Sequence, residues 1–309
     1  MSVALITHPA CLGHDCGRFH PECPDRLRAV LAALEGEAFA TLLRESAPQA
    51  TEEQLARAHP VDYVRAILAI RPAPGGSVQL DADTAMGASS AEAALRAAGG
   101  AVMAVDAVME GWARAAFAAV RPPGHHAEPG RPMGFCLFNN AAIAAHHGRA
   151  RWGLRRVAVV DFDVHHGNGT QAMFEADGDL FYGSSHQSPC YPGTGAREER
   201  GCADNIVNVP LPPGADGAAF RAAWSGAILP ALDRFAPELL IVSAGFDAHR
   251  ADPLAQLRLD VEDFAWITRE LMTIAERHAG GRIVSVLEGG YDLDALAASA
   301  AAHVRELMA

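Results

Sequence analysis

The segment from Val157 to Gly169, VAVVDFDVHHGNG, constrains the fold and function of this chain more than any other. Its opening residues, VAVV, are apolar and mostly β-branched without polar alternation, which predicts a strand buried on both faces of a parallel sheet. Polar side chains follow where the strand ends, and ligands of open α/β sheets bind beyond the carboxyl ends of the strands. The segment therefore predicts a buried strand that leads into a functional site.

Two side chains after this strand have the spacing of metal ligands. Asp163 and His165 are two residues apart, so in an extended chain they point to the same side. They offer a carboxylate oxygen and an imidazole nitrogen, two of the three protein ligands of a catalytic zinc site, and the third must come from elsewhere in the chain. An ordinary alternative is that these polar residues only cap the strand and begin a loop.

Length and composition favour a single domain over residues 1–309. Half of the 309 residues are hydrophobic, no linker interrupts the pattern, and no apolar run approaches the roughly eighteen residues of a membrane span. The first residues, MSVALITH, lack a basic start and a cleavage site, so they predict a first strand and no secretion signal. We therefore expect a soluble protein that does not bind membranes.

Cysteines and charge narrow the class of protein further. The six cysteines have no repeated CxxC spacing, which argues against a disulfide framework or a thiolate zinc cluster and favours a reducing cytoplasm. The net charge of −12 argues against binding to nucleic acid and would mildly attract basic substrates. The charge is therefore compatible with a basic substrate.

Apolar strand segments alternate with helical segments, which predicts an α/β fold with a parallel sheet covered by helices on both faces. After the first strand, further strands are expected at Ala115–Val120, Val157–Val160, Leu180–Ser184, Asn205–Val209, Leu239–Ser243 and Ile283–Leu287. Helices are expected at about Pro24–Glu35, Arg57–Ile70, Ser90–Glu110, from near Ala141, and at Ala218–Phe235, Val261–His278 and Leu293–Leu307. Proline and glycine predict loops at His8–Arg26 and Arg121–Asn140.

Four of the predicted strands end in the most polar segments of the chain, RPPGHH, DFDVHHGNG, SAGFDAH and LEGGYD. The carboxyl ends of parallel strands lie along one edge of a sheet, so we expect these segments to meet. Asp247 can then supply the missing oxygen, giving a site of two carboxylates and one imidazole with a position open for water. Zinc is favoured, with ferrous iron or cobalt as alternatives.

The same segments contain candidate catalytic side chains. His125 and His126 could provide a general base and an electrostatic partner, because imidazole titrates near neutrality. Tyr291 has a phenolic donor that could bind a carbonyl oxygen as negative charge develops on it. Asp161 and Asn168 are suitable acceptors for orienting the imidazoles. The ordinary alternatives are an inert histidine pair in a loop and a tyrosine packed on a loop.

The motifs RPPGHHAEPGRPMGFCLFNN, DFDVHHGNGTQ, YPGTG, SAGFDAH and LEGGYDL together resemble the zinc-dependent histone deacetylase family, closest to its class II and bacterial acetylpolyamine amidohydrolase-like members. The resemblance spans nearly the whole chain. It implies an arginase-like α/β fold with a central eight-stranded parallel sheet, and hydrolysis of an acyl amide to an amine and a carboxylate.

The resemblance also implies roles for individual residues. It assigns zinc to Asp163, His165 and Asp247. His126 becomes the general base and acid, His125 its electrostatic partner, and Tyr291 the donor to the carbonyl oxygen. Asp161 and Asn168 would orient His125 and His126 respectively. Class I members have aspartate where this chain has Asn168, and an uncharged amide should raise the basicity of His126 less than a carboxylate would.

Further residues match the family's substrate channel and a structural potassium site. Phe135 and Tyr191 match aromatic channel walls, although core packing would explain them equally well, and Gly134 matches a backbone contact to the substrate. Gly289, in the LEGGY motif, is also expected near the substrate. Arg26 resembles an arginine of the product channel, or is an ordinary residue at a helix N-terminus. Potassium would be held by side chains of Asp161 and Ser184 and by carbonyls of Asp163, His165 and Ser185.

Three other functions compete with removal of acyl groups from lysine. An arginase or agmatinase relative would need extra aspartates for a two-manganese cluster, and these motifs are absent from the sequence. A non-catalytic acyl-lysine binder is argued against by Tyr291, because histidine replaces this tyrosine in such relatives. A small acetylated polyamine is the third alternative. Polyamine-specific members have glutamate at the position of Leu254, and leucine cannot pair with a distant ammonium group, so we expect acyl-lysine to be preferred.

Overall fold

The centre of the protein is an eight-stranded sheet with the order β2-β1-β5-β10-β9-β6-β7-β8. The computed structural model describes residues 2–17, 19–73 and 75–309. All neighbouring strands of this sheet are parallel. The strands are β1 (Val3–Thr7), β2 (Leu43–Ser46), β5 (Ala115–Ala118), β6 (Val157–Asp161), β7 (Leu180–Gln187), β8 (Ile206–Leu211), β9 (Leu239–Ala244) and β10 (Ile283–Leu287).

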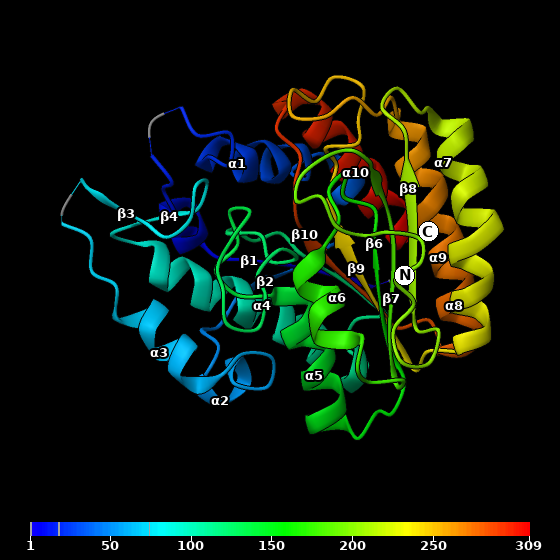
Figure 1. Ribbon diagram of the computed structural model, residues 1–309, viewed down its shortest axis with the longest axis horizontal. Helices are drawn as coiled ribbons and strands as arrows, with labels where there is room; N and C mark the ends of the chain where they lie inside the picture. The colour runs from blue at the N-terminus through cyan, green and yellow to red at the C-terminus, as the bar shows by residue number, and fades with distance from the viewer. Residues whose placement is uncertain (1, 18, 74) are drawn as a thin grey trace.

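Helices cover both faces of the sheet (Figure 1). On one face α4, α5 and α6 pack in sequence, and on the other α1 packs on α10, α10 on α9, and α9 on α8. The predicted α/β fold with a parallel sheet between two helical layers is thus confirmed. The helices are α1 (Pro24–Ala33), α2 (Glu52–Leu55), α3 (Val61–Ala69), α4 (Ser90–Glu110), α5 (Asn140–Trp152), α6 (Asn168–Phe174), α7 (Gly217–Ala223), α8 (Leu229–Phe235), α9 (Val261–His278) and α10 (Leu293–Met308).

The central strands form because their residues are apolar on both sides. Every residue of β5, β6, β9 and β10 is buried, as expected for parallel strands between two helical layers. These strands are neighbours, and their register places Ala118, Val286, Ser243 and Asp161 in one row. The segments that follow this row therefore begin at the same edge of the sheet.

Close packing of α4 against the chain before α2 depends on a glycine. A Cβ atom on Gly99 would lie 2.0 Å from the carbonyl oxygen of Pro48 and 2.8 Å from the amide nitrogen of Ala50. Gly99 therefore allows the helix to pack closely against this segment. Ser89 occupies the N-cap position of α4 but makes no capping hydrogen bond with its side chain.

Most predicted elements lie where expected, with shifts at their ends. The helix expected at Arg57–Ile70 begins only at Val61, because Pro60 takes the N-cap position. The helix expected at Ala218–Phe235 is α7 and α8 joined by a π-helical turn at Trp224–Ile228, just before Pro230, which has no N–H for a regular ladder. Met1 and Arg18, which belong to the predicted first strand and loop, lie outside the described residues.

Several short elements were not predicted. The edge strand β2 consists of exposed residues, LRES, and has no apolar pattern. A small antiparallel hairpin, β3 (Ser77–Gln79) and β4 (Ala85–Gly87), lies outside the main sheet. Helix α6 begins in the glycine-rich part of HHGNG, and two 3₁₀ turns occupy Pro9–Gly13 and Glu37–Phe39. These segments are short, so they lack the periodic apolar signal by which helices and strands are predicted.

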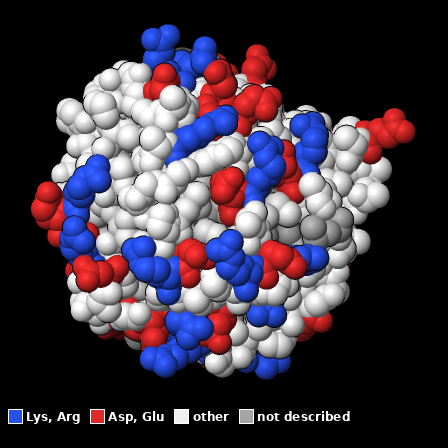
Figure 2. Space-filling model, turned by 90° about the vertical axis from the view of Figure 1, so that its right-hand side faces the viewer, with Lys and Arg blue, Asp and Glu red and all other residues white. Residues whose placement is uncertain are grey.

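The surface is mixed in charge on the face that carries α7 and α8. Figure 2 shows basic and acidic side chains interspersed on this face. Within the described residues, no helix is both long and apolar enough to cross a membrane.

Candidate active site

Three side chains from two strand ends converge as potential metal ligands. Asp163 and His165 follow β6, Asp247 follows β9, and one ligand atom from each lies within 4.8 Å of the others. The Nδ1 atom of His165 is 3.1 Å from Oδ1 of Asp163 and 3.2 Å from Oδ2 of Asp247. The sequence prediction that these three residues come together is confirmed, and they form a set that suits catalytic zinc.

The backbone around the site holds the two carboxylates in place. The amide of Gly289 donates to Asp163 Oδ2 at 2.8 Å, and the amide of Val164 donates to Asp247 Oδ1 at 2.8 Å. A Cβ atom on Gly289 would lie 2.1 Å from Asp247 Oδ2, and one on Gly245 would lie 2.0 Å from Asp163 Oδ2. Only glycine at these two positions allows the backbone to lie this close to the two carboxylates. Gly289, expected beside the substrate, thus lies against two of the potential metal ligands.

The electrostatics of this set also fit a divalent cation. Burial and the negative charge of Asp163 raise the pKa of Asp247 to about 7. Two buried carboxylates at one point are costly without a positive charge between them. A bound cation would therefore stabilise the arrangement that the backbone imposes.

A second group of potential ligands, His14, Cys16 and Glu22, lies at the start of the chain. Glu22 is ion-paired there with Arg26 and Arg121, and both pairs are fully buried. Burial alone would raise the pKa of Glu22, but Arg121 and the neighbouring cations outweigh it and lower the pKa to about 2. Because the guanidinium groups already satisfy this carboxylate, we do not consider the group a metal site.

His125 and His126 lie beside the potential metal ligands on the loop that follows β5. The Nδ1 atom of His125 donates to Asp161 Oδ2 at 2.9 Å, and Nδ1 of His126 donates to Asn168 Oδ1 at 2.9 Å. The Nε2 atom of His125 is 3.8 Å from Asp163 Oδ2. The expected contacts, His125 with Asp161 and His126 with Asn168, are present.

The two imidazoles have opposite electrostatic environments. Burial would lower the pKa of His125, but the charges of Asp163 and Asp161 outweigh burial and raise this pKa to about 10. Burial and the nearby His125 and His165 lower the pKa of His126 well below its usual value. At neutral pH His125 is thus a cation and His126 is a neutral imidazole that can accept a proton.

Tyr291 completes the group from the loop after β10. Its backbone amide donates to Asp252 Oδ2 at 2.7 Å, and burial raises the pKa of its phenol well above the usual value, so the hydroxyl remains a donor. The guanidinium of Arg26 lies 4.8 Å from the centre of its ring. Arg26 is fully buried and donates to the carbonyls of Glu288 and Gly290, so it holds the loop on which Tyr291 stands.

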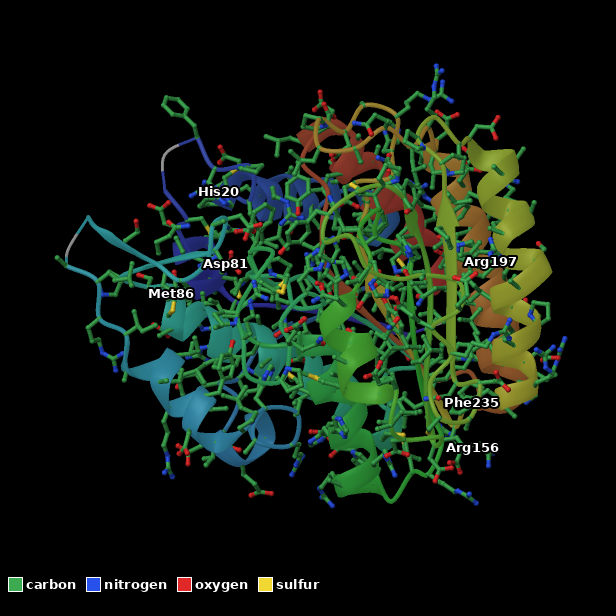
Figure 3. All side chains as sticks on the ribbon, in the orientation of Figure 1. His20, Asp81, Met86, Arg156, Arg197 and Phe235 are labelled. Carbon is green, nitrogen blue, oxygen red and sulfur yellow. The ribbon has the colours of Figure 1, made fainter. Side chains whose placement is uncertain are left out.

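A narrow cavity of about 220 Å³ leads to these groups. Gly134 on its wall has a φ of +56°, and a Cβ atom there would lie 2.4 Å from Cδ2 of His126. On the side of the β3–β4 hairpin, His20 packs edge-on against Phe135 and Asp81 pairs with Arg131 (Figure 3). The cavity is lined by Asp83, His126, Gly134, Phe135, His165, Tyr191, Leu254 and Tyr291.

Some residues of the site carried no recognisable signal in the sequence. Asp83 lines the cavity, and its Oδ1 accepts from the amide of Gly134, 51 residues away in the chain. Glu288 is fully buried and accepts from the amides of Gly124 and His125. Both contacts join distant segments, so only their position in the LDADT and LEGGY motifs could have drawn attention to them.

The residues expected to hold potassium are buried beside or among the potential metal ligands. Asp161 pairs in register with Ser184 across β6 and β7. The hydroxyl of Ser184 hydrogen-bonds to Nδ1 of His186, and that of Ser185 accepts from Nε1 of Trp224. Potassium binding stays a prediction.

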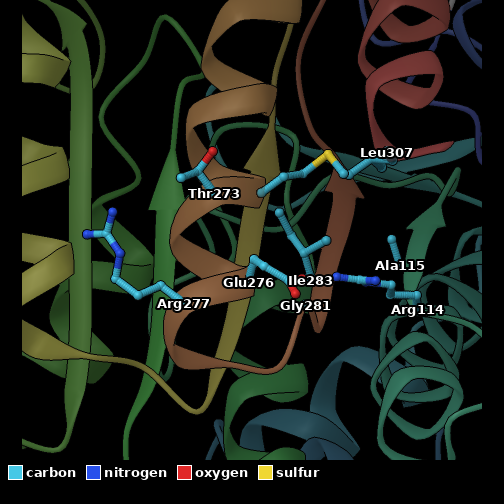
Figure 4. A pocket seen from close by; sticks show the side chains of 9 residues that line it. Arg114, Ala115, Thr273, Glu276, Arg277, Gly281, Ile283 and Leu307 are labelled. Carbon is cyan, nitrogen blue, oxygen red and sulfur yellow. Dashed lines mark ion pairs between the residues drawn. The ribbon is translucent and has the colours of Figure 1, made fainter. Parts of the chain in front are cut away.

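A further cavity of about 400 Å³ lies at the opposite ends of the strands (Figure 4). Ala115 and Ile283, the first residues of β5 and β10, line it, and an ion pair joins Arg114 to Glu276. It contains none of the potential metal ligands, His125, His126 or Tyr291. The chemistry of the molecule is therefore expected at the carboxyl ends of the strands.

Comparison with known proteins agrees with this geometry. Residues 20–307 match the description "Histone deacetylase domain". The chain is 44% identical over 292 residues to a histone deacetylase-like amidohydrolase of Pseudomonas aeruginosa, covering 93% of this chain and 74% of the relative. It is 36% identical over 304 residues to a probable deacetylase of Archaeoglobus fulgidus, covering 95% and 82%. A crystal structure of the HDA15 HD domain superposes with a TM-score of 0.93 at 36% identity, covering 99% of this chain and 88% of that one.

Proposed function

The chain belongs to the histone deacetylase family, and from this premise we propose that it removes acetyl or other acyl groups from the side-chain amine of lysine in peptides or proteins. One observation carries the proposal. Three potential metal ligands, a neutral imidazole and a phenolic donor meet at a narrow cavity with aromatic walls. This set suits hydrolysis of an amide at the end of a long, thin side chain.

We assign one zinc ion to Asp163, His165 and Asp247. The two carboxylates and one imidazole match the ligand types of catalytic zinc sites and leave a coordination position open. When bound, zinc supplies Lewis acidity for the amide carbonyl and for water. The glycines beside the carboxylates and the raised pKa of Asp247 support a cation at this position.

His126 is the proposed general base and acid. Its Nδ1 proton is committed to Asn168, so Nε2 is the atom that can accept a proton from water as the water oxygen attacks the carbonyl carbon. The same proton then passes to the amine nitrogen as the C–N bond breaks. The products are an amine and a carboxylic acid, which ionises in water.

His125 and Tyr291 are proposed to stabilise the negative charge that develops during attack. His125 stays protonated because Asp163 and Asp161 surround it with negative charge. Tyr291 keeps its phenolic proton and can donate it in a hydrogen bond to the carbonyl oxygen. The donor matters most in the transition state, so it should act on kcat more than on KM.

The cavity supports a linear acylated amine as substrate. Phe135 and Tyr191 form aromatic walls, and Leu254 adds an aliphatic side chain to the lining. A lysine side chain is a thin apolar rod, which these walls suit. Leu254 cannot form an ion pair with a second, distant ammonium group of a polyamine.

A polyamine substrate is the second candidate, because Asp83 also lines the cavity. One oxygen of this carboxylate accepts from the Gly134 amide and the Thr84 hydroxyl. Its other oxygen could pair with a cationic group of a polyamine or of a basic peptide. We favour acyl-lysine because the Asp83 carboxylate could pair with either a basic peptide or a polyamine. Leu254, in contrast, suits only the acyl-lysine substrate, since it cannot pair with a distant ammonium group.

We also propose a structural potassium ion at Asp161 and Ser184, with carbonyls of Asp163, His165 and Ser185. These residues are buried and neighbour one another at the ends of β6 and β7. Its charge would help to offset the buried carboxylates of this region.

A substrate panel tests the proposed function. We expect kcat/KM to be higher for acetyl-lysine or longer acyl-lysine peptides than for acetylspermidine or acetylputrescine. A clear advantage for an acetylpolyamine would overturn the assignment to lysine. Leu254→Glu should shift the ratio toward polyamine about 10-fold, because a partly desolvated charge pair contributes roughly 1–3 kcal/mol. If the ratio of kcat/KM values is unchanged in this variant, Leu254 does not determine the choice between the two substrates.

A further inference from the structure

The amide of Asn168 lies between His126 and a carboxylate that does not reach the cavity. Its Oδ1 accepts from Nδ1 of His126 at 2.9 Å, and its Nδ2 donates to Oε1 of Glu128 at 2.9 Å. The thioether of Met133 is a further acceptor, 3.4 Å from Nδ2. Asn168 is buried, so these contacts account for its orientation. Glu128 therefore stands two hydrogen bonds away from the histidine that we propose as the base.

The chemistry of these groups fixes the orientation of the amide. A carboxylate oxygen only accepts hydrogen bonds, so the nitrogen of Asn168 must face Glu128. Its oxygen then faces His126 and can only accept, which requires the imidazole to carry its proton on Nδ1. The lone pair of His126 is consequently on Nε2. If the amide turned over, its nitrogen would face Nδ1 and favour the tautomer with the proton on Nε2, which cannot act as a base there.

We propose that Glu128 is a positioning residue for the hydrolysis, which acts through Asn168 to hold His126 in the tautomer that has its lone pair on Nε2. The proposal rests on the proposed function, since it concerns the same histidine. Glu128 lines no part of the described cavity and is not among the potential metal ligands. Its effect on the reaction must therefore pass through the amide.

Glu128 is suited to this role by its own backbone. Its amide donates to the carbonyl of Arg131 at 3.0 Å, and the two residues form an isolated antiparallel bridge in the loop after His126. The side chain of Arg131 pairs with Asp81 at 3.0 Å. The carboxylate of Glu128 is thus placed by a short loop that begins at the histidines themselves.

A second series of hydrogen bonds, which also joins a histidine to a carboxylate through a side-chain amide, provides a matched control. Nε2 of His166 hydrogen-bonds to Oε1 of Gln171 at 2.9 Å, and Nε2 of Gln171 donates to Oε2 of Glu199 at 2.6 Å. Histidine, amide and carboxylate are thus linked in the same order as His126, Asn168 and Glu128. His166 does not line the described cavity, however, so loss of Glu199 should not affect a reacting imidazole.

The test compares Glu128→Ala and Glu128→Gln with Glu199→Ala in the zinc-loaded protein. In protein labelled with ¹⁵N-histidine, the nitrogen shifts of His126, assigned with a His126→Ala variant, report which nitrogen carries the proton. We expect Glu128→Ala to shift His126 toward a mixture of tautomers and to lower kcat about tenfold at unchanged KM. Glu128→Gln, whose amide oxygen can accept the same bond, should restore kcat to within about threefold of wild type. Glu199→Ala should leave kcat within about twofold.

Wild-type nitrogen shifts of His126 in Glu128→Ala would overturn the proposal, as would a loss confined to KM or equal losses in the Glu199→Ala control. If Glu128→Ala does not fold, Glu128→Met replaces it, because methionine has similar length and is only a weak acceptor. The spectroscopic readout does not need activity. A wild-type protein that hydrolyses no acyl-lysine peptide would refute the proposed function, and the His126 shifts would still decide the role of Glu128.

Discussion

His125 and His126 are neighbours in the chain with ring centres 4.0 Å apart, yet their environments leave His125 positively charged and His126 neutral. Each donates from Nδ1 to an oxygen at 2.9 Å, but the oxygen belongs to the carboxylate of Asp161 for His125 and to the amide of Asn168 for His126. The pKa of His125 is raised to about 10, whereas that of His126 is lowered. The charges around each ring, and not the residue type or the hydrogen-bond length, separate a fixed cation from a base: Asp163 and Asp161 raise the pKa of His125, whereas burial and the cationic His125 lower that of His126.

Removing the base should have the largest effect. We expect His126→Ala to lower kcat about 10³-fold, within the range of general acid–base catalysis, and to leave zinc content unchanged. His125→Ala should lower kcat less than His126→Ala does, because His125 is already protonated and cannot accept the proton from water. Equal kcat values for the two variants in steady-state assays, with zinc measured alongside, would break the comparison.

Tyr291→Phe should have the next largest effect. It removes the neutral donor and leaves the cationic His125 in place, so it separates the two groups proposed to stabilise the developing charge. Loss of one oxyanion donor typically costs about 10²-fold in kcat. The fold and zinc content should be unchanged. Near wild-type turnover would mean that the carbonyl is polarised without the phenol.

Asn168→Asp should have the smallest effect at neutral pH and the clearest effect on pH dependence. In wild type the pKa of His126 lies below the usual imidazole value of 6.5, so the ring stays neutral at pH 6.5. The value of kcat/KM should therefore fall only when the pH drops through that lowered pKa. A carboxylate at position 168 stabilises the imidazolium and raises this pKa, so activity should be lost at a higher pH, by about one unit or more. A kcat/KM profile with an unmoved acid limb would show that the partner's charge does not set the basicity of His126.

The sequence predicted the parts of the molecule that have a local signal. Its continuous apolar runs predict the bounds of strands β6, β9 and β10 to within a residue, and the spacing of Asp163 and His165 after a buried strand indicates a metal site. Asp247 could be joined to them because parallel strands end along one edge.

Other parts depend on contacts between distant residues. The strand β7 continues through Ser185, His186 and Gln187 only because β8 pairs with it there. Glu128 acquires its partner Asn168 40 residues later, and Asp83 acquires Gly134 after 51 residues. Such pairs form only when the loops pack together, so they cannot be predicted from the sequence of either segment alone.

Titration of the metal-free protein with zinc, followed by release of acetate from an acetyl-lysine peptide, tests the central claim most directly. The chain contains no lysine, so acetyl-lysine in the assay comes from the peptide alone. Because Asp163, His165 and Asp247 form one ligand set, activity should rise in proportion to zinc and reach its plateau at one equivalent per chain. A plateau at two equivalents, or equal activity with no zinc added, would contradict the account.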